Sequence, residues 1–203
     1  MRVSPFPMPS APPENFSELL ATMKRAGAVL REAEIEFMLG GGLAIWARGG
    51  PPTDHDVDFY VREVDAARAL DVLVHAGFRR ERPPEDWLYK AWDGHNLVDL
   101  IFHPAGGEIG DEHFARATAM EVNAQRLLVA SIDDVLVTKL LAITEQEPDY
   151  RAILEVARSL REQVDWNDVE ARTKQSPFAR AFFTLGEGLG IVERGTLLRS
   201  AQV

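Results

Sequence analysis

The sequence contains no cysteine, which excludes disulfide bonds, thiolate metal sites and cysteine nucleophiles, and which suits a cytoplasmic protein. Long apolar runs are also missing, so we predict no membrane-spanning segment and no membrane partner, and the N-terminus lacks the apolar core of a signal peptide. The five histidines show no metal-binding spacing, and neither a Gly-x-Ser-x-Gly motif nor a P-loop occurs. Serine hydrolases and Walker-type ATPases are therefore not indicated.

Positive charge is scarce, since 22 lysines and arginines face 32 aspartates and glutamates, for a net charge of −10. This balance argues against a protein that binds nucleic acid over its whole surface, although a local basic groove remains compatible with it. With 203 residues, of which 46% are hydrophobic, the chain can bury a substantial core as one domain or two small ones.

The chain divides into three parts by composition and pattern. Residues 1–13 contain five prolines and are expected to form a flexible arm. Residues 14–110 alternate between helical and strand patterns, which predicts an α/β unit, a mixed β-sheet backed by helices. After about residue 110 we expect the strands to stop, so that residues 111–203 form a helical C-terminal region.

The helices and strands are predicted from the spacing of apolar residues, from glycine turns and from helix-capping residues. We expect helices over 15–34, 65–77, 131–146, 149–163 and 179–191, strands over 35–39 and 56–61, a glycine turn entering a helix over 40–50, and a hairpin over 86–102 around Asp93-Gly94.

The predicted strand 56–61 carries acidic residues on one face. Asp56 and Asp58 point to one side of it, whereas Val57, Phe59 and Val61 point to the other. Carboxylates so close repel each other, which favours either a solvated edge strand or a cation site. The apolar face requires a core, so a free edge is the weaker interpretation.

A third carboxylate, Asp99, lies in an apolar strand between Val98 and Leu100, where an unpaired charge is costly. If this strand lies beside the strand 56–61, Asp56, Asp58 and Asp99 converge. Oxygen ligands of this kind suit Mg²⁺ or Mn²⁺ rather than zinc. Two such ions are able to hold triphosphate oxygens and activate an attacking hydroxyl.

The glycines before this strand complete the pattern. Gly41 and Gly42 follow a predicted strand and open a helix, so their backbone N–H groups are placed to contact phosphate. A tight strand-to-helix turn without ligand is the alternative.

Together these residues resemble the nucleotidyltransferase superfamily related to DNA polymerase β, over residues 35–102. The superfamily motif is a hydrophobic residue, Gly and Gly or Ser, then a spacer, then Asp-h-[Asp/Glu]-h, where h is hydrophobic. Here it reads Gly41-Gly42, thirteen residues, and Asp56-Val57-Asp58-Phe59, with Val98-Asp99-Leu100 as the third acidic strand. Where many members have Ser, this chain has Gly42, which implies that a hydroxyl contact to phosphate is lost.

The resemblance implies a metal-dependent enzyme that moves a nucleoside monophosphate from an NTP to an acceptor hydroxyl and releases pyrophosphate. Asp56, Asp58 and Asp99 would be the catalytic residues and would hold two Mg²⁺ ions, with Mn²⁺ as a possible substitute. Asp99 would also accept the proton of the acceptor hydroxyl.

Residues outside the motif have two interpretations each. Lys139 interrupts the apolar stripe of a helix that Ser131 caps, and it either snorkels to water or reaches the triphosphate. The second role is implied by a resemblance of this helix to AbiEii-type toxins, in which a downstream acidic residue, here matched by Asp149, also contributes. Arg48 is a candidate phosphate contact or a helix-end charge, and Lys90 faces either the substrate cleft or the surface.

The sequence leaves three functions open. In the first, the chain is a toxin of a toxin–antitoxin pair, which modifies tRNA and has an antitoxin partner. In the second it is a transferase for a small antibiotic or metabolite, and in the third it is a non-catalytic module that binds a nucleotide or a partner.

Overall fold

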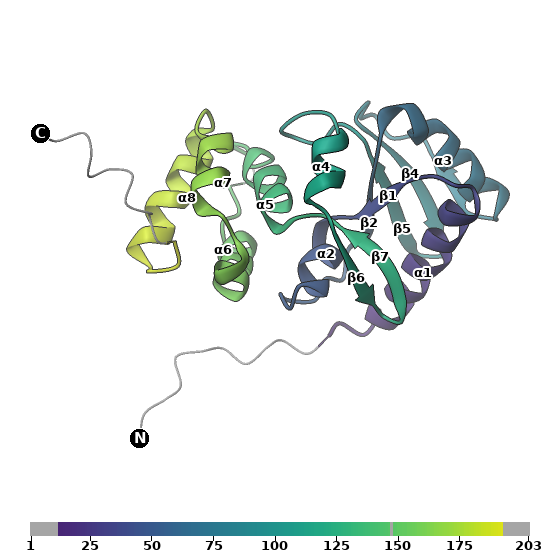
Figure 1. Ribbon diagram of the computed structural model, residues 1–203, viewed down its shortest axis with the longest axis horizontal. Coiled ribbons are helices and arrows are strands. Elements are labelled where there is room, and N and C mark those ends of the chain that lie inside the picture. Colours follow the sequence, from purple (N-terminus) through teal and green to yellow (C-terminus); the bar gives the residue numbers. More distant parts are fainter. Residues whose placement is uncertain (1–11, 147, 193–203) are drawn as a thin grey trace, which may run out of the picture.

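The computed structural model describes residues 12–146 and 148–192, which build a mixed β-sheet with helices on both sides and a group of helices at one end (Figure 1). The proline-rich arm predicted for residues 1–13 therefore lies, apart from Pro12 and Pro13, outside the described residues. In the described ranges, no helix combines the length and apolar character needed to cross a membrane.

The sheet has seven strands within the described part of the chain, in the spatial order β3-β4-β5-β2-β1-β7-β6. The central strand β2 pairs in parallel with β5 and antiparallel with β1, so the sheet is mixed, as the predicted fold class requires. The bounds are β1 Phe37–Leu39, β2 Asp56–Val61, β3 Arg79–Glu81, β4 Leu88–Asp93, β5 Asn96–Ile101, β6 Thr118–Val122 and β7 Gln125–Val129.

One face of the sheet is apolar and is covered by two helices, α1 (Phe16–Glu32) and α3 (Glu63–His75) (Figure 1). Val57, Phe59 and Val61 of β2 are fully buried on this face, which confirms the alternation predicted for the strand. The apolar residues at helical spacing in α1 are buried as well, because its amphipathic stripe is the surface that covers the strands.

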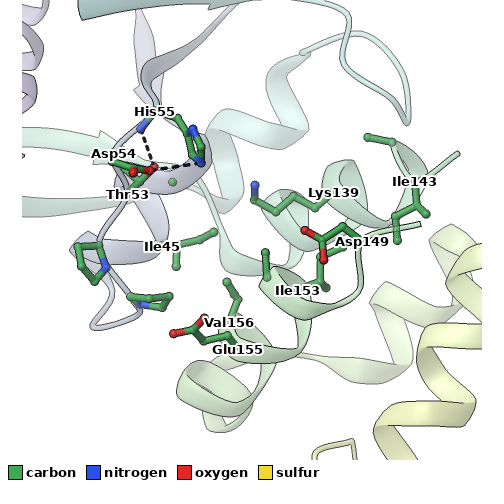
Figure 2. A pocket seen from close by; sticks show the side chains of 15 residues that line it. Ile45, Thr53, Asp54, His55, Lys139, Ile143, Asp149, Ile153, Glu155 and Val156 are labelled. Atoms are coloured by element: carbon green, nitrogen blue, oxygen red, sulfur yellow. Dashed lines mark hydrogen bonds and ion pairs between the residues drawn. The ribbon is translucent and has the colours of Figure 1, made fainter. Parts of the chain in front are cut away.

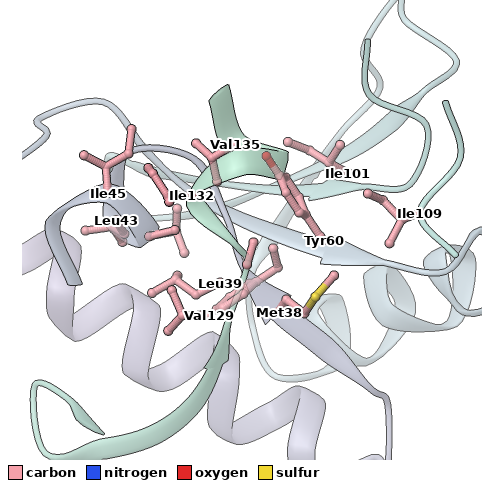
Figure 3. Close-up of a cluster of buried hydrophobic side chains, with 14 of the residues drawn as sticks. Met38, Leu39, Leu43, Ile45, Tyr60, Ile101, Ile109, Val129, Ile132 and Val135 are labelled. Atoms are coloured by element: carbon pink, nitrogen blue, oxygen red, sulfur yellow. The ribbon is translucent and has the colours of Figure 1, made fainter. Parts of the chain in front are cut away.

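The opposite face of the sheet, which carries the aspartates, is covered in part by α2 (Gly41–Ala47), and α5 (Ile132–Leu141) packs against α2. A short helix, α4 (Asp111–Arg116), follows β5 in the chain. Figure 3 shows this second part of the core, in which Leu43 of α2 and Val135 of α5 gather with Tyr60 of β2. Tyr60 is 2% exposed although it shares the face of Asp56 and Asp58. Helix α5 is thereby packed close to the acidic strand.

The prediction that strands stop near residue 110 is wrong, because β6 and β7 form a hairpin that extends the same sheet through the parallel pairing of β7 with β1. Its turn places Asn123 and Ala124 at φ of 48° and 60°. An alanine in this left-handed region is uncommon. Because the turn contains no glycine, the sequence lacks the usual signal of a hairpin here. β6 is mostly exposed, which removes the apolar alternation as well.

The wholly helical part begins at Ile132, and Figure 1 shows its helices at the end of the molecule away from α1 and α3. After α5 come α6 Arg151–Leu160, the short 3-10 helix η1 Arg161–Gln163, α7 Trp166–Thr173 and α8 Pro177–Gly188. Trp166, Phe182 and Phe183 pack together in tilted and edge-to-face arrangements, with ring centroids 5.5–6.3 Å apart. Helices α5, α7 and α8 pack on one another, and α6 packs on α5.

Candidate active site

Three carboxylates from two adjacent strands converge on the aspartate face of the sheet. Asp58 of β2 is paired directly with Asp99 of β5, and Asp56 lies two residues before Asp58 on the same face. One carboxylate oxygen from each of the three residues lies within 4.8 Å of the others. The convergence predicted from the two strand patterns is therefore confirmed.

The glycine turn approaches this cluster so closely that it excludes a side chain. Gly41 has a φ of 50°, and a Cβ built on it would lie 1.6 Å from Oδ2 of Asp58. The backbone N–H of Gly40 also donates to the carbonyl of Asp58 at 2.8 Å. Only glycine at position 41 leaves room for the Asp58 carboxylate in its observed place.

Lys90 is the direct counter-charge of Asp99. Its Nζ donates to both carboxylate oxygens at 3.2 Å, and the two side chains are 18% and 7% exposed. Of the two predicted alternatives, the structure thus places Lys90 at the cluster, from the neighbouring strand β4.

Two carboxylates of the cluster, Asp58 and Asp99, hold their protons more tightly than free carboxylates do. Burial, followed by repulsion from Asp56 and Asp99, raises the pKa of Asp58 to about 8, and Lys139 and Lys90 oppose the shift. Burial likewise raises the pKa of Asp99 to about 6, although the ammonium of Lys90 counteracts it. Burial is the largest cause in both cases, and repulsion between neighbouring carboxylates adds to it. A bound cation would relieve this repulsion.

The residues present fit a hard divalent cation. They offer only oxygen donors, the donors are close enough to share one or two ions, and they carry charge that lacks full compensation. Asp56, Asp58 and Asp99 are therefore able to hold a metal of the Mg²⁺ or Mn²⁺ type.

A cavity of about 510 Å³ is lined by Gly42 of the glycine turn and by Lys139, whereas Asp56, Asp58 and Asp99 are not among its lining residues. Gly42, Thr53 and His55 line one wall, and helices α5 and α6 supply the other. Figure 2 shows the Lys139 side chain extending from α5 toward the wall that Thr53 and His55 form. The lining residues are Gly42, Ile45, Pro51, Pro52, Thr53, Asp54, His55, Lys139, Ala142, Ile143, Asp149, Ala152, Ile153, Glu155 and Val156.

Lys139 links the cavity to the acidic cluster. It lines the cavity, and its positive charge lowers the pKa of Asp58 against the effect of burial. Asp149 lines the same cavity, where its Oδ1 accepts from the backbone N–H of Arg151 at 2.9 Å, at the start of α6. Lys139 and Asp149, the two residues that the resemblance to AbiEii-type toxins indicated, thus both line the cavity.

Arg48, in contrast, is used for structure. Its Nε donates to the carbonyl of Ala130 at 3.0 Å and its Nη2 to that of Val129 at 3.1 Å. Its own carbonyl accepts from Nε2 of Gln163 at 3.0 Å. Arg48 joins the end of α2 to the end of β7 and does not line the cavity, so we do not place it in the nucleotide site.

Helix α5, and with it Lys139, is held in place by a buried carboxylate. Asp134 is 3% exposed and accepts from Arg116 at 2.9 and 3.1 Å, from Arg172 at 2.6 Å and from the hydroxyl of Ser131 at 2.8 Å. Burial alone would raise the pKa of Asp134, but these hydrogen bonds outweigh it and lower the pKa. The predicted cap is also present, since the Ser131 hydroxyl accepts from the Asp134 N–H at 3.1 Å.

Thr53 is a polar cavity residue that the sequence patterns did not single out. It lies in the loop between α2 and β2, where neither helical nor strand periodicity applies. Only the path of that loop brings Thr53 next to Gly42.

Comparison with known proteins supports the fold through structure alone. No protein-family model matches the chain, and curated protein sequences give no match either. The solution structure of the antibiotic-resistance factor ANT(2'')-Ia is similar with a TM-score of 0.61 and 16% identity, covering 86% of this chain and 98% of that one. The lincosamide antibiotic adenylyltransferase LnuA, bound to lincomycin, is similar with a TM-score of 0.51 and 12% identity, covering 76% and 100%.

A third similar structure is JHP933 from Helicobacter pylori, with a TM-score of 0.52, 16% identity and coverage of 95% of this chain and 87% of that one. The similarity to ANT(2'')-Ia extends beyond the sheet, because 86% of 203 residues necessarily includes much of the helical part. The chain therefore has a mixed α/β fold of the nucleotidyltransferase type.

Proposed function

We propose that this protein is a metal-dependent nucleotidyltransferase, which moves a nucleoside monophosphate from an NTP to an acceptor hydroxyl. The observation that carries the proposal is the convergence of Asp56, Asp58 and Asp99 from adjacent strands, beside a glycine turn and a cavity of nucleotide size. The cavity volume of about 510 Å³ falls within the usual range of small-molecule sites.

In this mechanism the three aspartates hold divalent cations, Mg²⁺ or Mn²⁺, and orient the triphosphate. The cations, when bound, supply charge neutralisation of the phosphates. The backbone of Gly41 and Gly42 and the ammonium of Lys139 add phosphate contacts from the cavity side. Catalysis of this kind depends on positioning and charge stabilisation rather than on a covalent intermediate.

The acceptor oxygen forms a bond to the α-phosphorus, while the bond from that phosphorus to the pyrophosphate oxygen breaks. Asp99 takes the hydroxyl proton as the general base. Lys90, in contact with both oxygens of Asp99, fixes the orientation of this base.

We favour a small hydroxylated molecule as the acceptor. One structure of ANT(2'')-Ia, which is similar with a TM-score of 0.58, is a complex with adenylyl-2''-tobramycin, and LnuA was solved with lincomycin. The net charge of −10 also favours a small or cationic acceptor over a polyanion. These features support an antibiotic or a related metabolite.

Modification of tRNA by a toxin with an antitoxin partner is the second candidate. The helix that carries Lys139 resembles one in AbiEii-type toxins, but ANT(2'')-Ia is covered over 98% of its length, so a helical region of this kind fits either acceptor. The experiment below keeps this acceptor as a separate arm.

The test is a transfer assay with Mg²⁺ and each of the four α-labelled NTPs, offered with antibiotics, with a small-molecule extract and with total tRNA. The variant Asp58→Asn should lose transfer by about 10³-fold or more, because a metal ligand is removed. Glu63→Gln, an exposed change on α3, is the matched control and should transfer as the wild type does.

Label in an antibiotic or metabolite would support the favoured acceptor, and label in tRNA would support the toxin. Transfer that survives in Asp58→Asn would contradict the catalytic assignment. Binding of Mg²⁺–NTP without transfer to any acceptor would point to the non-catalytic module.

A further inference from the structure

Gly42 and Thr53 compete for one space at the wall of the cavity. A Cβ built on Gly42 would lie 2.7 Å from both Cβ and Oγ1 of Thr53, and 2.9 Å from its Cγ2. Contacts this short do not occur between real side chains, so only one of the two positions is able to carry a side chain there. In this protein, that position is 53.

The loop that carries Thr53 is held against α2. The N–H of Gly50 donates to the carbonyl of Ile45 at 3.0 Å, and Pro51 and Pro52 then limit the backbone before Thr53. A Cβ on Gly50 would lie 2.5 Å from the Ile45 side chain, which shows how closely the loop packs. Thr53 is therefore presented to the cavity by a constrained segment.

The hydroxyl of Thr53 accepts a hydrogen bond from its own loop. Its Oγ1 accepts from the backbone N–H of His55 at 3.4 Å, which is a long bond that uses one lone pair. A hydroxyl has one hydrogen to donate and two lone pairs, so the hydrogen is still able to donate to a ligand. The residue is half-buried, and it lines the cavity together with Gly42 and Lys139.

We propose that Thr53 donates its hydroxyl hydrogen to a phosphate oxygen of the nucleotide, in place of a side chain that position 42 does not have. The proposal rests on the proposed function, because it takes the triphosphate as the ligand of this wall. The Thr53 hydroxyl lines the same cavity as Gly42 and Lys139. It is a neutral donor that would contact the phosphate oxygens beside the Lys139 ammonium and, unlike that ammonium, would fix the direction of the hydrogen bond. The lack of a serine at position 42 is thereby compensated within the same space.

The experiment measures binding of Mg²⁺–NTP, for each of the four NTPs, and of Mg²⁺–tripolyphosphate by calorimetry. Tripolyphosphate has no base or sugar, so it reports on the phosphate contacts alone. Thr53→Val, which keeps the size but removes the hydroxyl, should weaken both ligands by about 10-fold, as expected for one hydrogen bond to a charged group. Thr53→Ser, which keeps the hydroxyl, should bind within about threefold of the wild type, well inside the loss expected for that bond.

The exchange variant Gly42→Ser with Thr53→Gly tests the shared space directly. Gly42→Ser alone should lower the melting temperature, because the new side chain overlaps Thr53, whereas the double variant should regain both stability and tripolyphosphate affinity. Thr118→Val, at an exposed position of β6, is the matched control and should change neither.

Equal tripolyphosphate affinity of Thr53→Val and the wild type would overturn the role of Thr53 and leave the proposed function intact. An affinity loss for NTP alone would likewise overturn it, since that would indicate a change in cavity shape. A wild-type protein that binds neither ligand would contradict the proposed function and this role together.

Discussion

Asp58 occupies the space in which a side chain at position 41 would otherwise lie, so the glycine turn and the acidic strand approach each other closely. The φ of 50° at Gly41 directs its backbone toward the carboxylate, whose Oδ2 would lie 1.6 Å from a Cβ. Glycine is thus required here for close approach as well as for conformation.

Gly41→Ala should therefore displace the Asp58 carboxylate and weaken binding of Mn²⁺ by about 10–100-fold, the range seen when groups that orient metal ligands are changed. Gly94→Ala is a matched control, because Gly94 also has a positive φ, of 61°, yet a Cβ there meets no described atom within 4 Å. The control should lose about 1–2 kcal/mol of stability from its backbone conformation and keep its metal affinity. Equal metal affinity in the two variants would mean that the contact with Asp58 is unimportant.

The raised pKa values give the metal-free protein a defined pH dependence. The pKa of Asp58 is about 8 in the folded state against an ordinary 3.8, so between these values the folded protein keeps a proton that the unfolded chain has lost. Lowering the pH from about 9 toward 5 therefore adds stability, and Asp99 adds to it with the same sign below about pH 6.

Asp58→Asn should remove most of this dependence. In chelator at pH 8 the variant should be more stable than the wild type by about 1 kcal/mol or more, which is roughly 2–4 °C in Tm for a chain of this size. The difference should shrink at pH 5, where Asp58 of the wild type is protonated. Melting curves of both proteins across this range check the prediction, and parallel curves would contradict it.

The sequence was sufficient to identify the three carboxylates, because a period of two in β2 and an acidic residue between apolar neighbours in β5 are local patterns. It did not reveal the contact of Gly41 with Asp58 or that of Gly42 with Thr53. The first contact depends on the turn from β1 into α2 and on the pairing of β1 with β2, and the second on the path of the loop between α2 and β2. The structural use of Arg48 also depends on β7, a strand that the sequence pattern did not reveal.

Helix α5 is the element that brings Lys139 to the acidic cluster, and its first turn is anchored by Asp134. Arg116 comes from α4 and Arg172 from α7, so the carboxylate of Asp134 joins three helices at a buried point. Removing one member of such a network leaves the partners without their hydrogen bonds.

Asp134→Ala should lower the free energy of unfolding by about 2–3 kcal/mol, since it removes several hydrogen bonds between charged groups. Asp168→Ala is the comparison, because Asp168 is 45% exposed and pairs only across one turn of α7 with Arg172. That change should cost about 0.5 kcal/mol or less. Urea unfolding of the two variants measures the difference, and similar losses would show that Asp134 is not the anchor of α5.

The elements predicted with success are those with a strong period or a clear turn signal: α1, α3, β2 and the hairpin of β4 and β5 around Gly94. The elements that the sequence did not indicate are short or exposed. β3 has three residues, α4 buries none, and the hairpin of β6 and β7 turns on Asn123 and Ala124 without glycine. These elements exist because of pairing with the sheet or packing against it, which single-sequence patterns do not record.

At the scale of the whole molecule, the cavity is made jointly by the sheet and the helical part. The glycine turn and the loop to β2 form one wall, and α5 and α6 form the other. Lys139 connects the two, because it lines the cavity and acts on the pKa of Asp58. We therefore interpret the lysine as a ligand contact rather than as a snorkelling surface residue.

Lys139→Met, which keeps the long apolar stem, should weaken binding of Mg²⁺–NTP by about 10-fold through loss of a charge-assisted contact to phosphate. Lys174→Met, an exposed change just after α7, is the matched control and should bind like the wild type. Calorimetry with both variants decides between the two interpretations of Lys139. An unchanged affinity in Lys139→Met would favour snorkelling.

The central claim is that Asp56, Asp58 and Asp99 form one cation site. The most direct test is a Mn²⁺ titration of the wild type and of Asp58→Asn at pH 8, followed by the magnetic resonance signal of free Mn²⁺. We expect the wild type to remove Mn²⁺ from solution and to bind it more tightly when NTP is present. The affinity of Asp58→Asn for Mn²⁺ should be lower by 10-fold or more, which is the size of loss seen when groups around metal ligands are changed. Equal titration curves for the two proteins would contradict the central claim.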